Sequence, residues 1–204
     1  MLPFDVILFD VGGVLLTNGW DLKERAEVAA HFDIDAAELE PRHEAMVDRW
    51  ERGDATIDEY LDNVVFYKPR SFSRDEFWAA MLGQSKLLAD GAMPVLKELA
   101  ASKQYLLGAL NNEARELNEY RLSAFQLRSY FDIALSSCYI GQRKPGAAIY
   151  QRAIDIVGRP AERILFIDDR PENAAAAESA GMKAIRFTGE ARLRAQLAGW
   201  PGGS

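Results

Sequence analysis

Three short apolar runs, each followed directly by polar residues, constrain the fold of this chain more than any other feature. The runs are residues 6–9 before Asp10, 105–110 before Asn111 and Asn112, and 164–167 before Asp168 and Asp169. Continuous apolar runs of about four to eight residues are typical of strands that are buried on both faces of a parallel sheet. Residues 133–135 and 184–187 are weaker strand candidates.

Segments with apolar residues at helical spacing separate these runs. They are residues 93–101, 114–125, 147–157 and 173–180, the last of which stops at Gly181. Strands that alternate with helices predict right-handed crossovers and a Rossmann-like, doubly wound parallel α/β sheet. Because such sheets bind ligands at the carboxyl ends of their strands, we expect the polar residues after the three runs to converge on one site.

Residues 18–88 interrupt this alternation, since they contain no convincing strand. Three pairs in this segment have the spacing of N-terminal capping boxes: Asp35 with Glu38, Thr56 with Glu59, and Ser73 with Glu76. We therefore predict a small helical insertion at 18–88 and a core formed by residues 1–17 and 89–204. The tail from Pro201 onward is predicted to be loose.

Composition excludes several classes of partner. The formal net charge is −7 without a basic run or tail, which argues against nucleic-acid and anionic-membrane binding. The one cysteine, Cys138, precludes an intrachain disulfide and is expected to be inert, while His31 and His43 are expected at the surface. The N-terminus lacks the features of a signal peptide, so we expect a cytoplasmic protein of undetermined oligomeric state. A small phosphorylated metabolite stays compatible, because a metal ion and local cations can reverse the field in a cleft.

The acidic residues at the strand ends are the first candidates for chemistry. Asp10 lies just before the pair Gly12 and Gly13, and its carboxylate can attack phosphorus or bind a hard metal ion. A turn of the form Asp-x-Gly-Gly without a chemical role is the alternative. Asp168 and Asp169 are adjacent acids that a Mg²⁺ ion would neutralise, whereas helix capping explains one of them better than both.

Cationic and amide side chains supply the rest of the predicted site. Lys144, which precedes a proline, and its neighbour Arg143 can reach into a cleft to screen negative charge, with solvated surface positions as the alternative. Asn111 and Asn112 can donate hydrogen bonds to phosphate oxygens, and one of them can instead cap the helix that follows.

The order of these features resembles the haloacid dehalogenase superfamily along essentially the whole chain. The first motif of that family is an Asp, any residue, a second Asp and a Gly, which residues 10–13 match except at Gly12. Its second motif, a Ser or Thr, is replaced by Asn111. Its third motif matches Lys144, and its fourth, an acidic pair, matches Asp168 and Asp169. The helical insertion resembles the small cap of the family, and the Asp-x-Gly and Arg-Lys-Pro features resemble the branch that includes α-glucose 1-phosphate phosphatases.

The resemblance implies a role for each matched residue. Asp10 would be the nucleophile and a Mg²⁺ ligand, the Gly12 carbonyl a second ligand, and Asp169 a third, with Asp168 binding directly or through water. Lys144 would neutralise the crowded negative charge, and Asn111 would bind the phosphoryl group. The second Asp, which is usually the general acid, is absent. Such an acid is worth about 10²–10⁴ in rate, so a substrate with a good leaving group would suffer least.

The sequence therefore predicts a Mg²⁺-dependent phosphatase of a small phosphorylated metabolite, with sugar phosphates as candidates. One alternative is a carbon–halogen hydrolase, which starts from the same Asp without magnesium. Another is a catalytically weak regulatory protein that binds metal or phosphate, which the replacements at Gly12 and Asn111 favour. Substrate contacts would come from the insertion, where Trp20, Trp50 and Glu51 are candidates and Trp50 is equally suited to the core.

Overall fold

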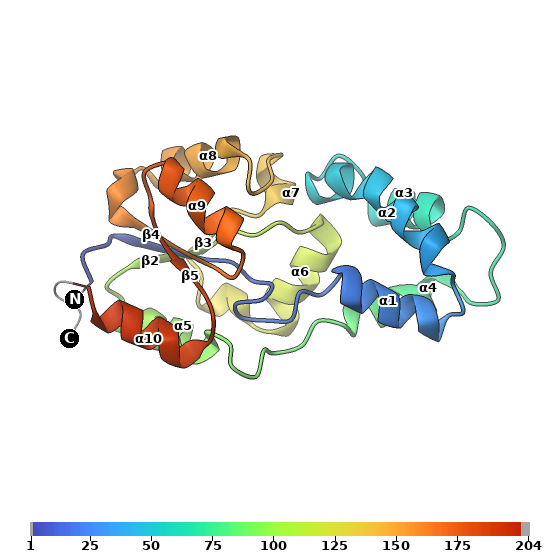
Figure 1. The fold of residues 1–204 in the computed structure, drawn as a ribbon, viewed down its shortest axis with the longest axis horizontal. Coiled ribbons are helices and arrows are strands. Elements are labelled where there is room, and N and C mark those ends of the chain that lie inside the picture. Colours follow the sequence, from blue (N-terminus) through green and yellow to red (C-terminus); the bar gives the residue numbers. More distant parts are fainter. Residues whose placement is uncertain (1, 201–204) are drawn as a thin grey trace.

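The computed structural model describes residues 2–200, which form one five-stranded parallel sheet with helices on both faces (Figure 1). The strands are β1 (Val6–Phe9), β2 (Leu106–Ala109), β3 (Ile133–Ala134), β4 (Ile164–Asp168) and β5 (Lys183–Arg186). Their spatial order is β3-β2-β1-β4-β5, so the chain winds outward from β1 in both directions. This is the predicted doubly wound α/β arrangement. The tail from Pro201, predicted to be loose, lies outside the described residues.

Ten α-helices and two 3₁₀ turns are present among the described residues. Those before β2 are α1 (Leu22–His31), α2 (Ala36–Glu51), α3 (Ile57–Val64), α4 (Arg74–Leu82) and α5 (Met93–Ser102). Those after it are α6 (Arg115–Ala124), η1 (Leu127–Ser129), α7 (Ser137–Ile140), α8 (Ala147–Val157), η2 (Ala161–Arg163), α9 (Pro171–Ser179) and α10 (Glu190–Ala198). None of the described helices is both long and apolar enough to cross a membrane.

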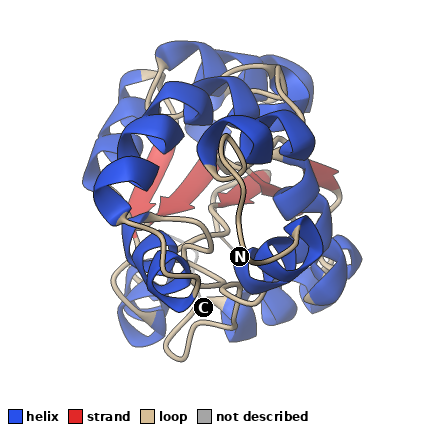
Figure 2. Ribbon diagram, turned by 90° about the vertical axis from the view of Figure 1, so that its right-hand side faces the viewer, coloured by secondary structure: helices blue, strands red, loops and turns tan. Residues whose placement is uncertain are grey.

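The alternation of side chains along β1 explains the layers. Ile7 and Phe9 point into a cluster completed by residues of α5 and α10, whereas Val6 and Leu8 point into a cluster completed by residues of α8 and α9. Successive residues of a strand face opposite sides, so a strand buried on both faces is apolar throughout. Figure 1 shows α5 and α10 below the sheet and α8 and α9 above it, and Figure 2 shows the strands enclosed between helices.

Helices α1 to α4 form the helical insertion, which extends from the sheet at the right of Figure 1. They share a hydrophobic cluster that contains the buried side chains of Trp50, Tyr60 and Phe77. The capping boxes predicted at Thr56 and Ser73 are both present.

The third predicted capping box, at the start of α2, is wrong. Asp35 does cap α2 by accepting a hydrogen bond from the Ala37 amide. Glu38 does not return one, because its carboxylate is engaged by Tyr67 and Lys68 instead. Tyr67 and Lys68 lie far from Glu38 along the chain, so a pattern of neighbouring residues cannot predict that they bind its carboxylate.

The structure differs from the expected elements mainly at weak patterns. Helix α10 was not among the expected elements, because only Leu193 and Leu197 of its nine residues are buried. The four-residue helix α7 is also too short to give a periodic signal. Most expected strands and helices end within one or two residues of the observed bounds.

Candidate active site

The polar residues that follow β1, β2 and β4 lie at one edge of the sheet, beside a polar cavity between the core and the helical insertion. The cavity has a volume of about 360 Å³. Its core-side lining is Asp10, Gly12, Asn112, Glu113, Arg121, Arg143, Lys144, Pro145, Arg170, Glu172 and Asn173. Its lining from the insertion is Asn18, Trp20, Asp21, Arg25, His43, Glu44, Val47, Trp50 and Glu51. The carboxyl ends of β1, β2 and β4 meet at this edge because the three strands are neighbours in the sheet and run parallel.

Lys144 joins the ends of β1 and β4. Its Nζ lies 3.0 Å from Asp10 Oδ2 and 2.6 Å from Asp168 Oδ2, and all three side chains are almost completely buried. Burial alone would lower the pKa of Lys144, but the two carboxylates raise it, so the ammonium stays charged. Burial raises the pKa of Asp10, and Lys144 opposes that shift. One cation thus compensates two buried acids, and the alternative of a solvated surface lysine is wrong.

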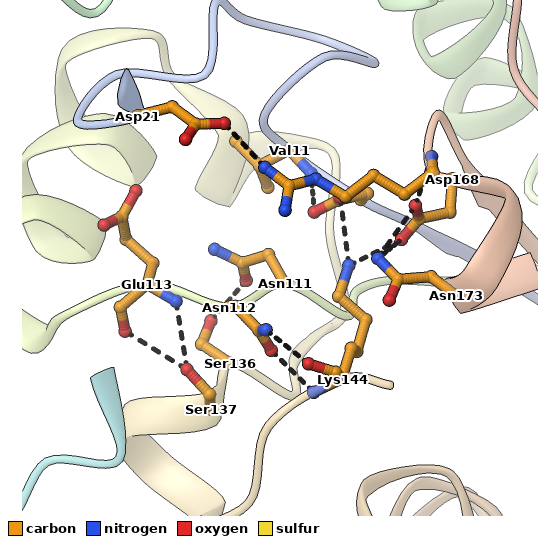
Figure 3. A network of polar contacts seen from close by, with 12 residues as sticks. Val11, Asp21, Asn111, Asn112, Glu113, Ser136, Ser137, Lys144, Asp168 and Asn173 are labelled. Atoms are coloured by element: carbon orange, nitrogen blue, oxygen red, sulfur yellow. Dashed lines mark hydrogen bonds and ion pairs between the residues drawn. The ribbon is translucent and has the colours of Figure 1, made fainter. Parts of the chain in front are cut away.

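Both carboxylate oxygens of Asp168 accept hydrogen bonds (Figure 3). Its Oδ1 accepts hydrogen bonds from the Arg170 amide and from Asn173 Nδ2, and its Oδ2 accepts from Lys144 and again from Asn173. A carboxylate with this many donors is fixed in position. Asp168 therefore orients Lys144, and it anchors the start of α9.

Asp169 is the less engaged acid of the pair. Its Oδ1 is buried and has no hydrogen-bond partner within residues 2–200. Burial, and then the neighbouring Asp168, raise the pKa of Asp169. The carboxylate packs against Gly13, where an added Cβ would lie 2.3 Å from Asp169 Oδ2. Only glycine therefore fits at position 13 without displacing the Asp169 carboxylate. A buried carboxylate oxygen without a partner is compatible with a bound cation.

Asp10, Asp168 and Asp169 together fit a divalent cation. One carboxylate oxygen from each lies within 4.8 Å of the others. Hard oxygen donors of this kind suit Mg²⁺, and the orphaned oxygen of Asp169 supplies a position for it. Gly12, on the turn after β1, also lines the cavity.

The two asparagines after β2 have different positions. Asn111 is 1% exposed and is not part of the cavity lining; its amide donates to Asn118 Oδ1 and accepts from Ser136 Oγ. Asn112 lines the cavity, and both ends of its amide bind the main chain of Lys144. Neither residue caps α6, which begins after Ala114 without a side-chain cap, so the capping alternative is wrong.

Arg143 connects the core to the insertion. Its guanidinium contacts Asp48 Oδ1 at 3.2 Å and Glu51 Oε2 at 2.7 Å, both on α2. The Glu51 contact is an ion pair that is too poorly aligned for a hydrogen bond. Burial raises the pKa of Glu51 to about 7, and Arg143 opposes that shift. Glu51 therefore presents a titratable carboxyl to the cavity near neutral pH.

His43 is buried in the insertion, so its predicted surface position is wrong, whereas His31 is exposed as expected. His43 Nδ1 lies 2.8 Å from Tyr60 Oη, and that oxygen also accepts a hydrogen bond from Trp20 Nε1. Burial, and then the charge of Arg25, lower the pKa of His43 to about 4. Trp50 stacks on Tyr60 at 3.9 Å between ring centroids and is 1% exposed, which makes it chiefly a core residue.

Sequence reasoning missed a buried ion pair at the cavity. Arg121 Nη1 donates to Glu113 Oε2 at 2.5 Å, and Arg121 Nη2 donates to the Thr17 carbonyl. Burial raises the pKa of Glu113, and Arg121 opposes that shift. No motif marks this pair, because only the fold brings Thr17 beside α6.

Comparisons with known proteins agree with this architecture. A family model described as haloacid dehalogenase-like hydrolase matches residues 4–181. A phosphoglycolate phosphatase from Aquifex aeolicus is 27% identical over 106 residues, which are 52% of this chain and 50% of that protein. This chain thus spans about half the length of that relative.

Solved structures share the fold at low identity. A HAD family enzyme from Bacteroides thetaiotaomicron, in a magnesium complex, aligns with a TM-score of 0.77 and 19% identity over 92% of this chain and 94% of its own. An L-2-haloacid dehalogenase aligns with a TM-score of 0.61 and 19% identity over 89% and 83%. At such identities the likeness extends to the fold and not to the reaction. Because the family match covers most of its length, the chain belongs to the haloacid dehalogenase-like hydrolases.

Proposed function

We propose that this chain is a Mg²⁺-dependent phosphatase of a small phosphorylated metabolite, which acts through an aspartyl-phosphate on Asp10. The observation that carries the proposal is the position of Asp10, whose carboxylate lines the cavity beside Lys144 and within a cluster of three acids. Phosphoryl transfer needs mainly positioning and charge neutralisation, and this arrangement supplies both.

Each residue of the cluster has a task in this proposal. Asp10 attacks phosphorus, and its Oδ1 is oriented by a hydrogen bond from the Val11 amide. Lys144 offsets the negative charge that accumulates when the phosphate approaches buried carboxylates. Asn112 holds the main chain of Lys144, so its contribution is to position that ammonium.

The acidic cluster would hold the metal through Asp10, Asp169 and the Gly12 carbonyl. Asp168 has four hydrogen-bond contacts that already occupy both of its oxygens, which favours an indirect role for it. A bound Mg²⁺ ion would neutralise charge on the phosphoryl oxygens. Residues 18–88 would act as the cap, with His43 and Glu51 among the residues that line the cavity from the insertion side.

The size and polarity of the cavity favour a small, polar substrate. About 360 Å³ accommodates a small metabolite such as a sugar phosphate, and most of the lining side chains are charged or polar. The phosphoglycolate phosphatase relative supports a small phosphorylated compound as substrate.

The experiment is phosphate release from a panel of sugar, acyl and nucleotide monophosphates, with and without Mg²⁺, for the native protein and Asp10→Asn. We expect turnover that requires both the metal and Asp10. Halide release from 2-haloacids without Mg²⁺ would instead establish a carbon–halogen hydrolase. Mg²⁺ binding without any turnover above Asp10→Asn would establish a regulatory binding protein.

A further inference from the structure

The turn after β1 lacks the acidic side chain that would protonate a leaving group, and Arg121 stands beside the vacant position. A Cβ added at Gly12 would lie 3.1 Å from Asn18 Oδ1 and 3.8 Å from Arg121 Nη2. The space that a side chain at position 12 would enter is therefore bordered by an amide and a guanidinium. All three residues line the cavity that contains Asp10.

The guanidinium of Arg121 is held in place. It is 2% exposed, and its two terminal nitrogens donate to Glu113 Oε2 and to the Thr17 carbonyl. Its Nε is buried and has no hydrogen-bond partner within the described part of the chain. Gly19 makes room for the group, since a Cβ there would lie 3.1 Å from Arg121 Nη1. A fixed, dehydrated cation of this kind needs no reorganisation when a negative charge forms beside it.

An arginine and a carboxylic acid assist a leaving group differently. A guanidinium keeps its proton at all ordinary pH values, so it cannot act as a general acid. It can stabilise a departing oxyanion through hydrogen bonds and charge. The assistance is then largest where negative charge accumulates on the leaving oxygen.

We propose that Arg121 stabilises the leaving oxygen as an anion in place of the missing acid, and this inference rests on the proposed phosphatase function. An Asp10 oxygen forms a bond to phosphorus while the bond between phosphorus and the leaving oxygen breaks, and the electron pair stays on that oxygen. The oxyanion takes its proton from water after departure. Water then attacks the aspartyl-phosphate, which releases inorganic phosphate and restores the Asp10 carboxylate.

This arrangement selects a chemical class of substrate. Leaving oxygens that are weak bases depart readily as anions, as in anomeric sugar phosphates, acyl phosphates and diphosphates. Phosphates of ordinary alcohols have strongly basic leaving oxygens and need a proton that neither Gly12 nor Arg121 supplies. We expect the native protein to prefer the first group.

The test measures kcat/KM for a series of aryl phosphates with graded leaving-group pKa, with Mg²⁺, in the native protein, Arg121→Lys and Arg121→Met. Removing one donor to a developing oxyanion costs about 10²–10³-fold. We expect Arg121→Met to lose about that factor on the most basic leaving groups and far less on the most acidic, so that the dependence steepens. The leaving-group dependence of Arg121→Lys should lie between those of the native protein and Arg121→Met.

Controls separate this role from a structural one. Arg115→Met removes an arginine of the same helix that also donates to a main-chain carbonyl, that of Cys138, outside the cavity lining, and should leave the dependence unchanged. If Arg121→Met does not fold because Glu113 loses its partner, Glu113→Gln combined with Arg121→Met removes both charges of the pair. An equal loss for every leaving group in the Arg121 variants would overturn the proposal. Activity that survives in Asp10→Asn would instead overturn the aspartyl-phosphate mechanism on which this inference rests.

Discussion

Replacing Gly13 by alanine tests whether the turn after β1 and Asp169 form one metal site. Gly13 has a φ of +69°, and an added Cβ would lie 2.3 Å from Asp169 Oδ2 and 2.5 Å from its Cγ. The left-handed backbone costs an alanine about 1–2 kcal/mol. The overlap cannot be relieved without rotating the carboxylate away, so the variant should lose both stability and a metal ligand.

The expected magnitude follows from linkage between metal binding and unfolding. At a Mg²⁺ concentration of about 100 times Kd, the native protein should gain about 2.7 kcal/mol in free energy of unfolding. If displacement of Asp169 weakens Mg²⁺ affinity by about 100-fold, as severe perturbation of a metal site does, the gain at that concentration falls to about 0.4 kcal/mol. Urea unfolding at several Mg²⁺ concentrations measures both values.

Gly12→Ala is the matched control for this variant. Gly12 has no positive φ, and its added Cβ meets Asn18 Oδ1 at 3.1 Å, which a small side-chain shift relieves. Its carbonyl stays in place, so Gly12→Ala should keep the Mg²⁺-dependent gain. A Gly13→Ala protein with the same gain as the native protein would refute the assignment of Asp169 as a ligand.

Three further predictions follow from the buried groups. Lys144→Met should lower the free energy of unfolding by about 3–5 kcal/mol near neutral pH, because Asp10 and Asp168 lose their shared cation. The loss should be smaller in acid, because the pKa of Asp10 is raised and its carboxylate is then neutralised; equal losses in urea unfolding at both pH values would contradict this. His43 is neutral in the fold with a pKa of about 4, against 6.5 ordinarily, so stability should fall by up to about 3 kcal/mol as pH drops from 6.5 to 4. His43→Gln should flatten that dependence in unfolding measured across the range, and an unchanged slope would show that another group titrates. Burial raises the pKa of Cys138 to about 12, so the thiol should react with iodoacetamide only after unfolding, and rapid labelling of the native protein would count against its burial.

His43 and Asn112 show that local sequence patterns do not predict the environment of a side chain whose partners are distant in sequence. His43 has no partner pattern in the sequence, yet it is buried because Tyr60 and Trp20, from other parts of the insertion, satisfy it. Asn112 looks like a helix cap, but its amide is occupied by the main chain of Lys144. Both results depend on partners that lie far away along the chain.

The acidic cluster, in contrast, could be predicted from the sequence pattern. Asp10 and Asp168 stand at the ends of apolar runs that are typical of central strands, and parallel strands bring their carboxyl ends together. The approach of these acids is therefore predicted by the hydrophobic pattern and the strand order.

The sequence by itself determined the doubly wound sheet, the position of the helical insertion along the chain, and the convergence of Asp10, Lys144 and the acidic pair at one edge. The sheet and the convergence of the acids follow from periodicity and strand order, whereas the role of Lys144 was implied by the resemblance to the family. Only the tertiary structure decided that Arg121 stands beside Gly12 and that one oxygen of Asp169 has no hydrogen-bond partner among residues 2–200. Side-chain packing between distant segments fixes both, and the energy of each contact depends on every partner at once.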